Sequence, residues 1–269
     1  MSCNLTMAAT ARADSPGGRS VSQLVTLLAG SRQAIATEQA AVVAAESQPV
    51  PATPFDAARQ AMQNGATVDR YRTTIRDEQA AIYQLAGSDT LAAQVLSQLG
   101  SRTPPGLANA IAALQALWTL LGVTDFSRVR PVASHAVDGA APAATLLGYA
   151  QQAAVQNRIA WGYLAAINYI ESDFGRNNGP SSAGALGPMQ FLPSTWAAYG
   201  AGGDIEDPHD AIFTAGRYLR LMGAPGDYSL AIRRYNNDAN YVQAVTDFAS
   251  ALDADPLWFY RLYYWDTYG

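Results

Sequence analysis

One acidic side chain, Glu171, stands out because it follows a mostly apolar run, "LAAINYI". Leu164, Ile167 and Phe174 recur at helical spacing. Glu171 comes four residues after Ile167 and therefore lies on the same helix face. An apolar environment disfavours the charged carboxylate and raises its pKa, which suits a general acid near neutral pH. The alternative is an exposed helix end where Glu171 points to water, and the spacing alone is compatible with both.

The segment after Glu171 is polar and rich in small residues. Gly175 is predicted to end the helix that carries the acid. The following "SSAGALGPMQF" contains two glycines, which allow a sharp turn or a close approach of backbone to a ligand. Gln190 stands between Met189 and Phe191, so a polar side chain separates two expected core residues. The pattern predicts a ligand-contacting turn beside the acid.

Other catalytic arrangements have weaker support. Asp204, Asp207 and Asp210 have a spacing that could suggest a metal site. Asp207 is also a plausible N-cap, with Asp210 in the first turn of the following helix, so capping explains two of the three. His209 is expected to be exposed in that turn, and the chain's two histidines do not form a pair that indicates zinc. We therefore predict no metal, no cofactor and no Ser/Cys–His nucleophile.

The elements that would position these residues are helical. No segment alternates convincingly like a strand, and no internal repeat is visible. Apolar periodicity predicts four helices before the middle of the chain, over residues 21–46, 57–86, 88–99 and 106–121, and helices resume at about residue 144. The sequence therefore predicts an all-α (mainly α) fold.

The uncharged stretch 106–124 approaches the length of a membrane span. Asn109, Gln115 and Thr119 interrupt it, and two prolines and a glycine bound it. Its large apolar residues recur every three or four positions, as in a core helix: Leu107, Ile111, Leu114, Trp118 and Leu121. A core helix is predicted, and no transmembrane segment.

The pattern divides the chain into four parts. Residues 1–20 are predicted to be a disordered polar tail, 21–122 a helical accessory region, 123–142 a linker, and 143–269 a C-terminal helical domain. If the division is right, a fragment of residues 140–269 should fold alone.

Composition narrows the function and the location. The chain has 269 residues, 49% of them hydrophobic, which is enough for a substantial core. Its net charge of −5 disfavours a generic nucleic-acid partner. Cys3 is the single cysteine, so no intrachain disulfide forms. A lipid anchor at Cys3 is disfavoured, because only Met1 and Ser2 precede it. Ala11-Arg12-Ala13 matches a signal-peptidase pattern, but the apolar segment that should precede it is missing, so either the start is truncated or the pattern arises by chance.

Several motifs, in order and spacing, resemble the catalytic domain of lytic murein transglycosylases. They are "ES" at Glu171-Ser172, "SSAGALGPMQFLPSTWAAYG", "GDIEDPHDAIFTAGRYL" and "RYNNDANYVQAV". The resemblance covers residues from about 144 to 269. It implies a lysozyme-like fold and an extracytoplasmic location. The implied partner is the peptidoglycan glycan strand, cut at the β-1,4 bond between N-acetylmuramic acid and N-acetylglucosamine. For the helical region before residue 122 no partner is implied.

The resemblance also implies residue roles. Glu171 would be the single catalytic acid and base, and Ser181 would orient the substrate N-acetyl group. Gln190 would bind substrate beside the acid, while Tyr235 and Asn236 would close the site. A turn-forming Ser181 and satisfied core positions for Gln190 and Tyr235 are the alternatives. Some related enzymes carry a calcium-binding loop. This chain has only the short "AGGDIEDPHD" at that position, so calcium is not expected.

A single firm carboxylate favours substrate-assisted chemistry, because glycosidases otherwise use two. Asp173 is two residues from Glu171 and would point elsewhere on a helix. The expected product then has a 1,6-anhydromuramic acid end. A hydrolytic muramidase on the same fold and a non-catalytic cell-wall-binding protein are the alternatives, and the presence of Glu171 argues against the second.

Overall fold

The computed structural model describes residues 18–268, apart from residues 50, 52, 130 and 133–139. The predictions for Cys3, for the A-x-A pattern and for most of the 1–20 tail lie outside this range. Eleven α-helices and two very short strands make up the described part, which confirms the all-α prediction. The α-helices are α1 (Val21–Glu46), α2 (Pro54–Ala86), α3 (Asp89–Leu99), α4 (Leu107–Leu120), α5 (Ala143–Asn157), α6 (Trp161–Ser172), α7 (Pro193–Tyr199), α8 (Pro208–Leu221), α9 (Tyr228–Tyr235), α10 (Ala239–Ala254) and α11 (Trp258–Tyr264). Strands β1 (Pro131–Val132) and β2 (Thr267–Tyr268) pair antiparallel.

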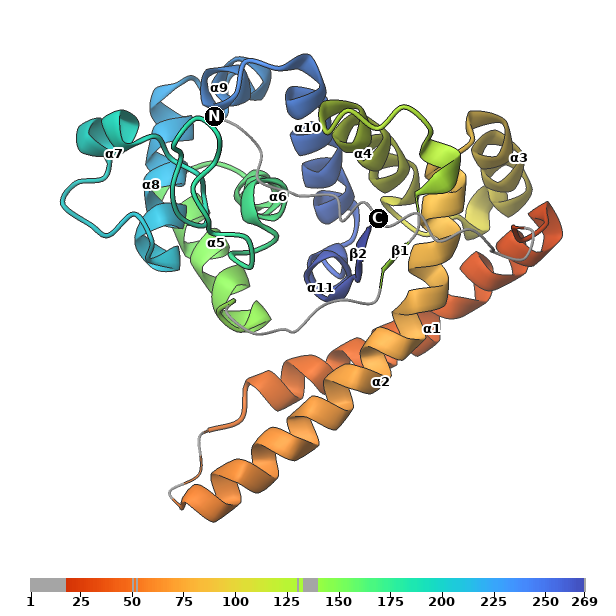
Figure 1. Ribbon diagram of the computed structural model, residues 1–269. Coiled ribbons are helices and arrows are strands. Elements are labelled where there is room, and N and C mark those ends of the chain that lie inside the picture. Colours follow the sequence, from red (N-terminus) through yellow and green to blue (C-terminus); the bar gives the residue numbers. More distant parts are fainter. Residues whose placement is uncertain (1–17, 50, 52, 130, 133–139, 269) are drawn as a thin grey trace.

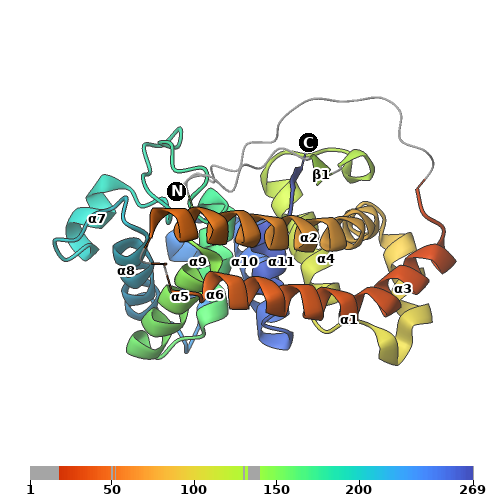
Figure 2. The same cartoon turned by 90° about the horizontal axis from the view of Figure 1, so that it is seen from below.

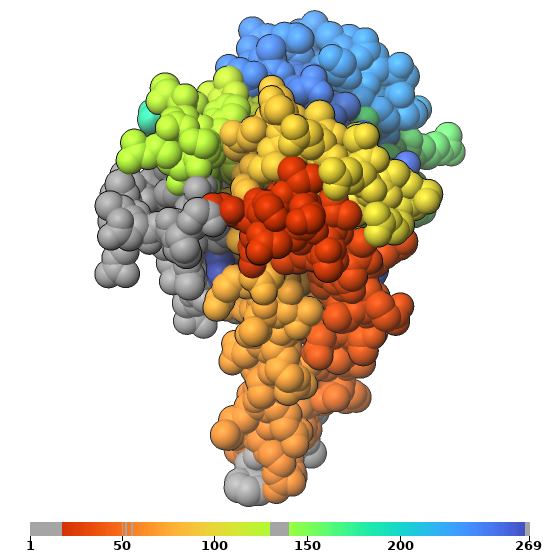
Figure 3. Space-filling model, turned by 90° about the vertical axis from the view of Figure 1, so that its right-hand side faces the viewer, coloured from red at the N-terminus to blue at the C-terminus, as the bar shows by residue number. Residues whose placement is uncertain are grey.

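Helices α1 and α2 form a long hairpin whose joined end projects beyond the rest of the molecule (Figures 1 and 3). Seen from below, the two helices run side by side (Figure 2). A capping box of Ser20 and Gln23 starts α1 at the predicted residue. Helix α2 begins three residues before its predicted start. The Thr53 side chain accepts a hydrogen bond from the Asp56 N–H, and Pro54 occupies the first turn, where its missing N–H costs nothing.

Helix α4 lies along α10 and is a core helix, as predicted (Figure 1). Leu114 and Trp118 have no exposed surface. Among the described residues, no helix is long and apolar enough to cross a membrane.

One hydrophobic core runs from α1 to the end of the chain, from Leu24 to Trp265. Several polar contacts join the two regions that the sequence pattern separates. The Trp258 indole donates to the Pro105 carbonyl at 2.9 Å, Arg261 Nε contacts Glu78 Oε2 at 3.0 Å, and Gln79 Nε2 donates to the Asp266 carbonyl at 2.6 Å. The four-part division stays a prediction, but the regions before and after residues 123–142 share one hydrophobic core.

The aromatic C-terminal segment packs inward. Every side chain of α11 is buried. Tyr263 lies under the Arg176 guanidinium at 4.2 Å, and Trp258 packs edge-on against Trp265. This aromatic layer supports α6, whose residues from Leu164 onward are buried among α5, α8, α10 and α11.

Candidate active site

The C-terminal end of α6 positions Glu171. The helix ends at Ser172, with Asp173 as its C-cap, so it stops before Gly175, the residue that was predicted to end it. Asp173, Phe174 and Gly175 all have positive φ, at 51°, 57° and 91°. A left-handed conformation at Phe174 costs free energy, and the burial of its ring against Tyr169 offsets that cost.

The Ser172 side chain connects this helix end to the next loop. Its hydroxyl donates to the Pro188 carbonyl at 2.7 Å and accepts from the Gly175 N–H at 2.8 Å. Asn168 Nδ2 also donates to the Pro188 carbonyl, at 2.9 Å. The segment around Pro188 is thereby held on the end of α6 that carries Glu171.

Glu171 is fully buried, which excludes the exposed helix end considered as an alternative. The Tyr241 hydroxyl, on α10, donates to Oε1 at 2.6 Å. Oε2 is buried and has no hydrogen-bond donor in the described part of the chain. Burial raises the pKa of Glu171 from 4.5 to about 7, and the Tyr241 hydrogen bond partly opposes the shift. At neutral pH the carboxyl can therefore both give and take a proton.

Gln190 lies in a tight turn beside this acid. Leu186 and Phe191 pair across the turn, and Gln190 itself has a φ of 47°. Its amide Nε2 donates to the Gly187 carbonyl at 2.9 Å, while its Oε1 is buried and receives no hydrogen bond from the described residues. Half of the side chain is thus satisfied within the turn, and an acceptor is left for a ligand.

Gly187 is required for the turn. Its φ is 72°, and a Cβ atom there would lie 1.9 Å from the Ile205 carbonyl oxygen. Residues with a side chain are excluded by both the backbone conformation and the contact.

Tyr235 and Asn236 stand at the end of α9. The Tyr235 hydroxyl donates to the Met189 carbonyl at 2.6 Å, so this buried side chain is satisfied within the protein. Burial raises the pKa of Tyr235 well above its usual value, and the nearby Glu171 adds to the shift. Asn236 is the half-exposed C-cap of α9, and its N–H donates to the Ile232 carbonyl at 2.9 Å.

Ser181 forms a turn of its own. Its hydroxyl accepts from the Ala185 N–H at 3.0 Å, and its N–H donates to the Ala185 carbonyl at 3.0 Å. The hydrogen bonds of Ser181 therefore agree with its alternative role as a turn former. Pro188 and Met189 tie Gln190 and Tyr235 to the end of α6 that carries the acid, whereas the bonds between Ser181 and Ala185 lie within one turn.

Tyr241 is the residue that sequence reasoning missed. It lies in the quoted motif "RYNNDANYVQAV", and Asp238 caps α10 by accepting from the Asn240 and Tyr241 N–H groups. Recognising Asp238 as the N-cap would have placed Tyr241 in the first turn of a buried helix. Its pairing with Glu171, 70 residues earlier, carries no sequence signal of its own.

The acidic group at the start of α8 includes the cap of that helix. Asp207 caps the helix, as predicted, by accepting from the Asp210 N–H. Oxygen or nitrogen atoms of Asp207, His209 and Asp210 lie within 4.8 Å of one another, but Asp210 already accepts from the Asp204 N–H. These bonds are the ones that capping and a tight loop require.

The comparisons with known proteins agree with this arrangement. Residues 148–255 match the family model described as "Transglycosylase SLT domain". No curated protein and no solved structure was found to match the chain. The matched range contains Glu171, Tyr241 and the four residues assigned by resemblance to substrate binding. This part of the chain, residues 148–255, therefore belongs to the transglycosylase SLT domain family.

Proposed function

We propose that the protein is a lytic transglycosylase that cleaves the β-1,4 bond between N-acetylmuramic acid and N-acetylglucosamine in peptidoglycan and forms 1,6-anhydromuramic acid ends. The observation that carries the proposal is the Glu171 carboxyl, buried, with a pKa of about 7 and with one oxygen free of described donors. The family match supports the substrate class. Action on peptidoglycan places the working protein outside the cytoplasm.

In the first step Glu171 is the acid. It protonates the oxygen that links muramic acid to the leaving N-acetylglucosamine, and the C1–O4 bond breaks. The muramic acid acetamido oxygen attacks C1 and forms an oxazolinium ion, so no enzyme nucleophile is needed. Asp173 is the nearest carboxylate to Glu171 in the sequence. It pairs with Arg176 at 3.4 Å, which supports a mechanism in which Asp173 is not the nucleophile.

In the second step Glu171 is the base. Its carboxylate takes the proton from the muramic acid 6-hydroxyl, O6 attacks C1, and the acetamido group leaves C1 and is restored. The 6-hydroxyl competes well with water, because an oriented intramolecular group reaches effective molarities of about 10⁵ M or more. The roles proposed for the other residues follow the resemblance: Ser181 and the free Gln190 oxygen orient the acetamido group, and Tyr235 and Asn236 close the site around the ring.

Mass spectrometry of digested peptidoglycan tests this function. Muropeptides released by the wild-type protein should carry anhydro ends, lighter by one water and resistant to borohydride. Mainly reducible ends would mean a hydrolytic muramidase. Glu171→Gln should lower product formation by at least about a hundredfold, the low end of general acid–base contributions. Absence of products from the folded wild-type protein would favour the non-catalytic wall-binding alternative.

A further inference from the structure

A small hollow lies at the opposite end of α6 from Glu171. It has a volume of about 220 Å³ and is formed by the first turn of α6 and the last turns of α10. This is smaller than the roughly 300–1,000 Å³ of pockets for drug-sized ligands, and it fits one monosaccharide unit. Glu171 comes nine positions after Gly162 on the same helix, which is about 13 Å at the α-helical rise. The hollow is therefore separate from the candidate active site.

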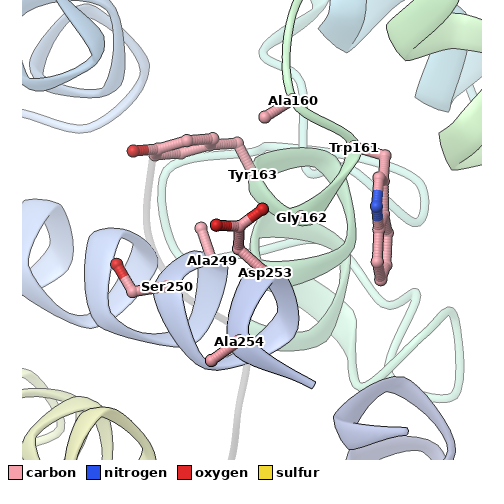
Figure 4. A pocket seen from close by; sticks show the side chains of 8 residues that line it. All are labelled: Ala160, Trp161, Gly162, Tyr163, Ala249, Ser250, Asp253 and Ala254. Atoms are coloured by element: carbon pink, nitrogen blue, oxygen red, sulfur yellow. The ribbon is translucent and has the colours of Figure 1, made fainter. Parts of the chain in front are cut away.

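Small residues and two aromatic rings shape the hollow. Its floor contains Gly162 and Ala249, where a Cβ on Gly162 would come within 3.1 Å of the Ala249 carbonyl. In Figure 4 the side chains of Trp161 and Tyr163 leave opposite sides of the first turn of α6, and the Asp253 carboxylate lies on the Tyr163 side. Flat apolar rings beside a hydrogen-bonding group are suited to a sugar ring, which has apolar C–H faces and polar edges.

Both rings are fixed by neighbours before any ligand binds. Tyr163 stacks on Tyr228, with centroids 3.8 Å apart and planes 3° from parallel. Trp161 makes an edge contact with Phe259 at 6.4 Å. Binding would therefore cost little side-chain entropy, which is the usual advantage of preorganisation.

The charges at the hollow favour a neutral ligand that both donates and accepts hydrogen bonds. Asp253 is exposed, and no described residue donates a hydrogen bond to its carboxylate, so it disfavours an anion and accepts from a donor. The first turn of α6 has no side-chain cap and contains no acidic residue, so its N–H groups and positive dipole end disfavour a cation. An acetamido group combines an N–H donor with a carbonyl acceptor and meets both requirements.

We propose that this hollow is a second, non-catalytic binding site for an N-acetylated hexosamine. Trp161 and Tyr163 flank the sugar ring, Asp253 accepts from the amide N–H or a ring hydroxyl, and the first-turn N–H groups of α6 donate to the acetamido oxygen. That the sugar belongs to a peptidoglycan strand rests on the proposed function. Such a site would hold a neighbouring strand and raise the local concentration of substrate at Glu171.

The binding test uses the full chain with Glu171→Gln, which prevents turnover, and the probe triacetylchitotriose. The reporter is the indole N–H nuclear magnetic resonance signal of Trp161, identified by its loss in Trp161→Phe. We expect a saturable shift at millimolar probe. Asp253→Asn should weaken binding at least about fivefold, the loss of a hydrogen bond to a charged group. Asp247→Asn, on the same helix outside the hollow, should leave binding unchanged.

Three results would overturn the proposal: no shift of the Trp161 signal, an equal shift in Asp253→Asn, or a shift caused by tetramethylammonium but not by the sugar. An equal response to cellotriose, which lacks acetamido groups, would overturn the N-acetyl assignment. These outcomes are independent of the product assay, because the binding test needs no catalysis. In otherwise wild-type protein, Asp253→Asn should reduce binding to insoluble sacculi and leave cleavage of short soluble strands unchanged.

Discussion

At the scale of single residues, the candidate site depends on how the protein surrounds one carboxyl group. Burial raises the pKa of Glu171, and the Tyr241 hydroxyl lowers it, with burial the larger influence. Gln190 contributes an unsatisfied buried oxygen in the next loop. The position of Glu171 on an apolar helix face could be predicted from residue spacing. The pairing with Tyr241 could not, because it depends on how α10 packs against α6.

The raised pKa of Glu171 predicts a pH-dependent stability cost. The unfolded chain ionises this group near pH 4.5 and the folded chain near pH 7, so the folded state loses stability as pH rises between these values. The full shift corresponds to about 3 kcal/mol. Glu171→Gln should therefore gain up to about 3 kcal/mol over the wild type on going from pH 4 to pH 8. Chemical denaturation at both pH values measures this, and a pH-independent difference would contradict it.

Tyr241 should tune the pH at which the enzyme works. Tyr241→Phe removes a hydrogen bond that favours the charged carboxylate, so the pKa of Glu171 should rise further. The protonated acid is needed for the first step, so the decline of kcat/KM on the alkaline side should move to higher pH. Tyr218→Phe is the matched control, because the Tyr218 hydroxyl donates to the Arg234 carbonyl, away from the acid. An unshifted profile in Tyr241→Phe would show that the hydrogen bond does not set this pKa.

At the scale of elements, the helices were predictable and the loops that complete the site were not. Apolar periodicity predicted α1 to α4 and the start of α5 to within three residues, and Asp207 was recognised as the cap of α8. The early end of α6 was missed because Asp173, which is not a glycine, already adopts the left-handed conformation that the pattern assigned to Gly175. The turn around Gln190 was expected from its glycines, but which of them is indispensable depends on Ile205, a residue on another loop.

Two glycines with similar backbone conformations should therefore respond differently to alanine. Gly187→Ala meets the Ile205 carbonyl and distorts the turn that holds Gln190, so we expect a loss of about 3 kcal/mol or more and strongly reduced activity. Gly202 has a φ of 82° but open space around it, so Gly202→Ala should cost only about 1 kcal/mol. Thermal melting and muropeptide release measure both. Equal effects would mean that the contact with Ile205 relaxes freely.

At the scale of the whole molecule, the accessory helices and the family-matched region share one core. Helix α4 packs along α10, the helix that supplies Tyr241. The buried pair of Glu78 and Arg261 joins α2 to α11, with both side chains at most 3% exposed. The sequence pattern suggested a boundary because residues 123–142 are irregular. Irregular composition marks a loop, however, and only packing decides whether a loop separates two cores.

Removing one member of the buried ion pair should destabilise the whole molecule. Glu78→Gln leaves the buried Arg261 charge with only the more distant carboxylate of Asp255, at 3.6 Å, so we expect a cost of about 3 kcal/mol. Asp77→Asn changes the neighbouring residue, which pairs with Arg19 at the surface, and should cost less than about 1 kcal/mol. We expect loss of helix and loss of activity to coincide in a single melting transition of Glu78→Gln. Two separate transitions would indicate independent domains.

A truncation tests whether residues 123–142 separate two domains or connect parts of one core. The pattern predicts that residues 140–269 fold alone. Packing predicts the opposite, because the fragment would expose the face of α10 that α4 covers and leave Arg261 without Glu78. We expect the fragment to lack a cooperative thermal transition, whereas the full chain should show one. Cooperative melting of the fragment with lytic activity would establish the boundary at 123–142.

The packing of α4 on α10 also affects the order of events during synthesis. Trp258 bonds to Pro105 across 153 residues of sequence, and Arg261 to Glu78 across 183. Contacts of such long range form late and slowly. Until the ribosome has made α10, the face of α4 that packs on α10 has no partner. A nascent chain in this state is prone to aggregate or to bind chaperones, and it acquires Tyr241, and with it the hydrogen bond to Glu171, only after the first 240 residues have been made.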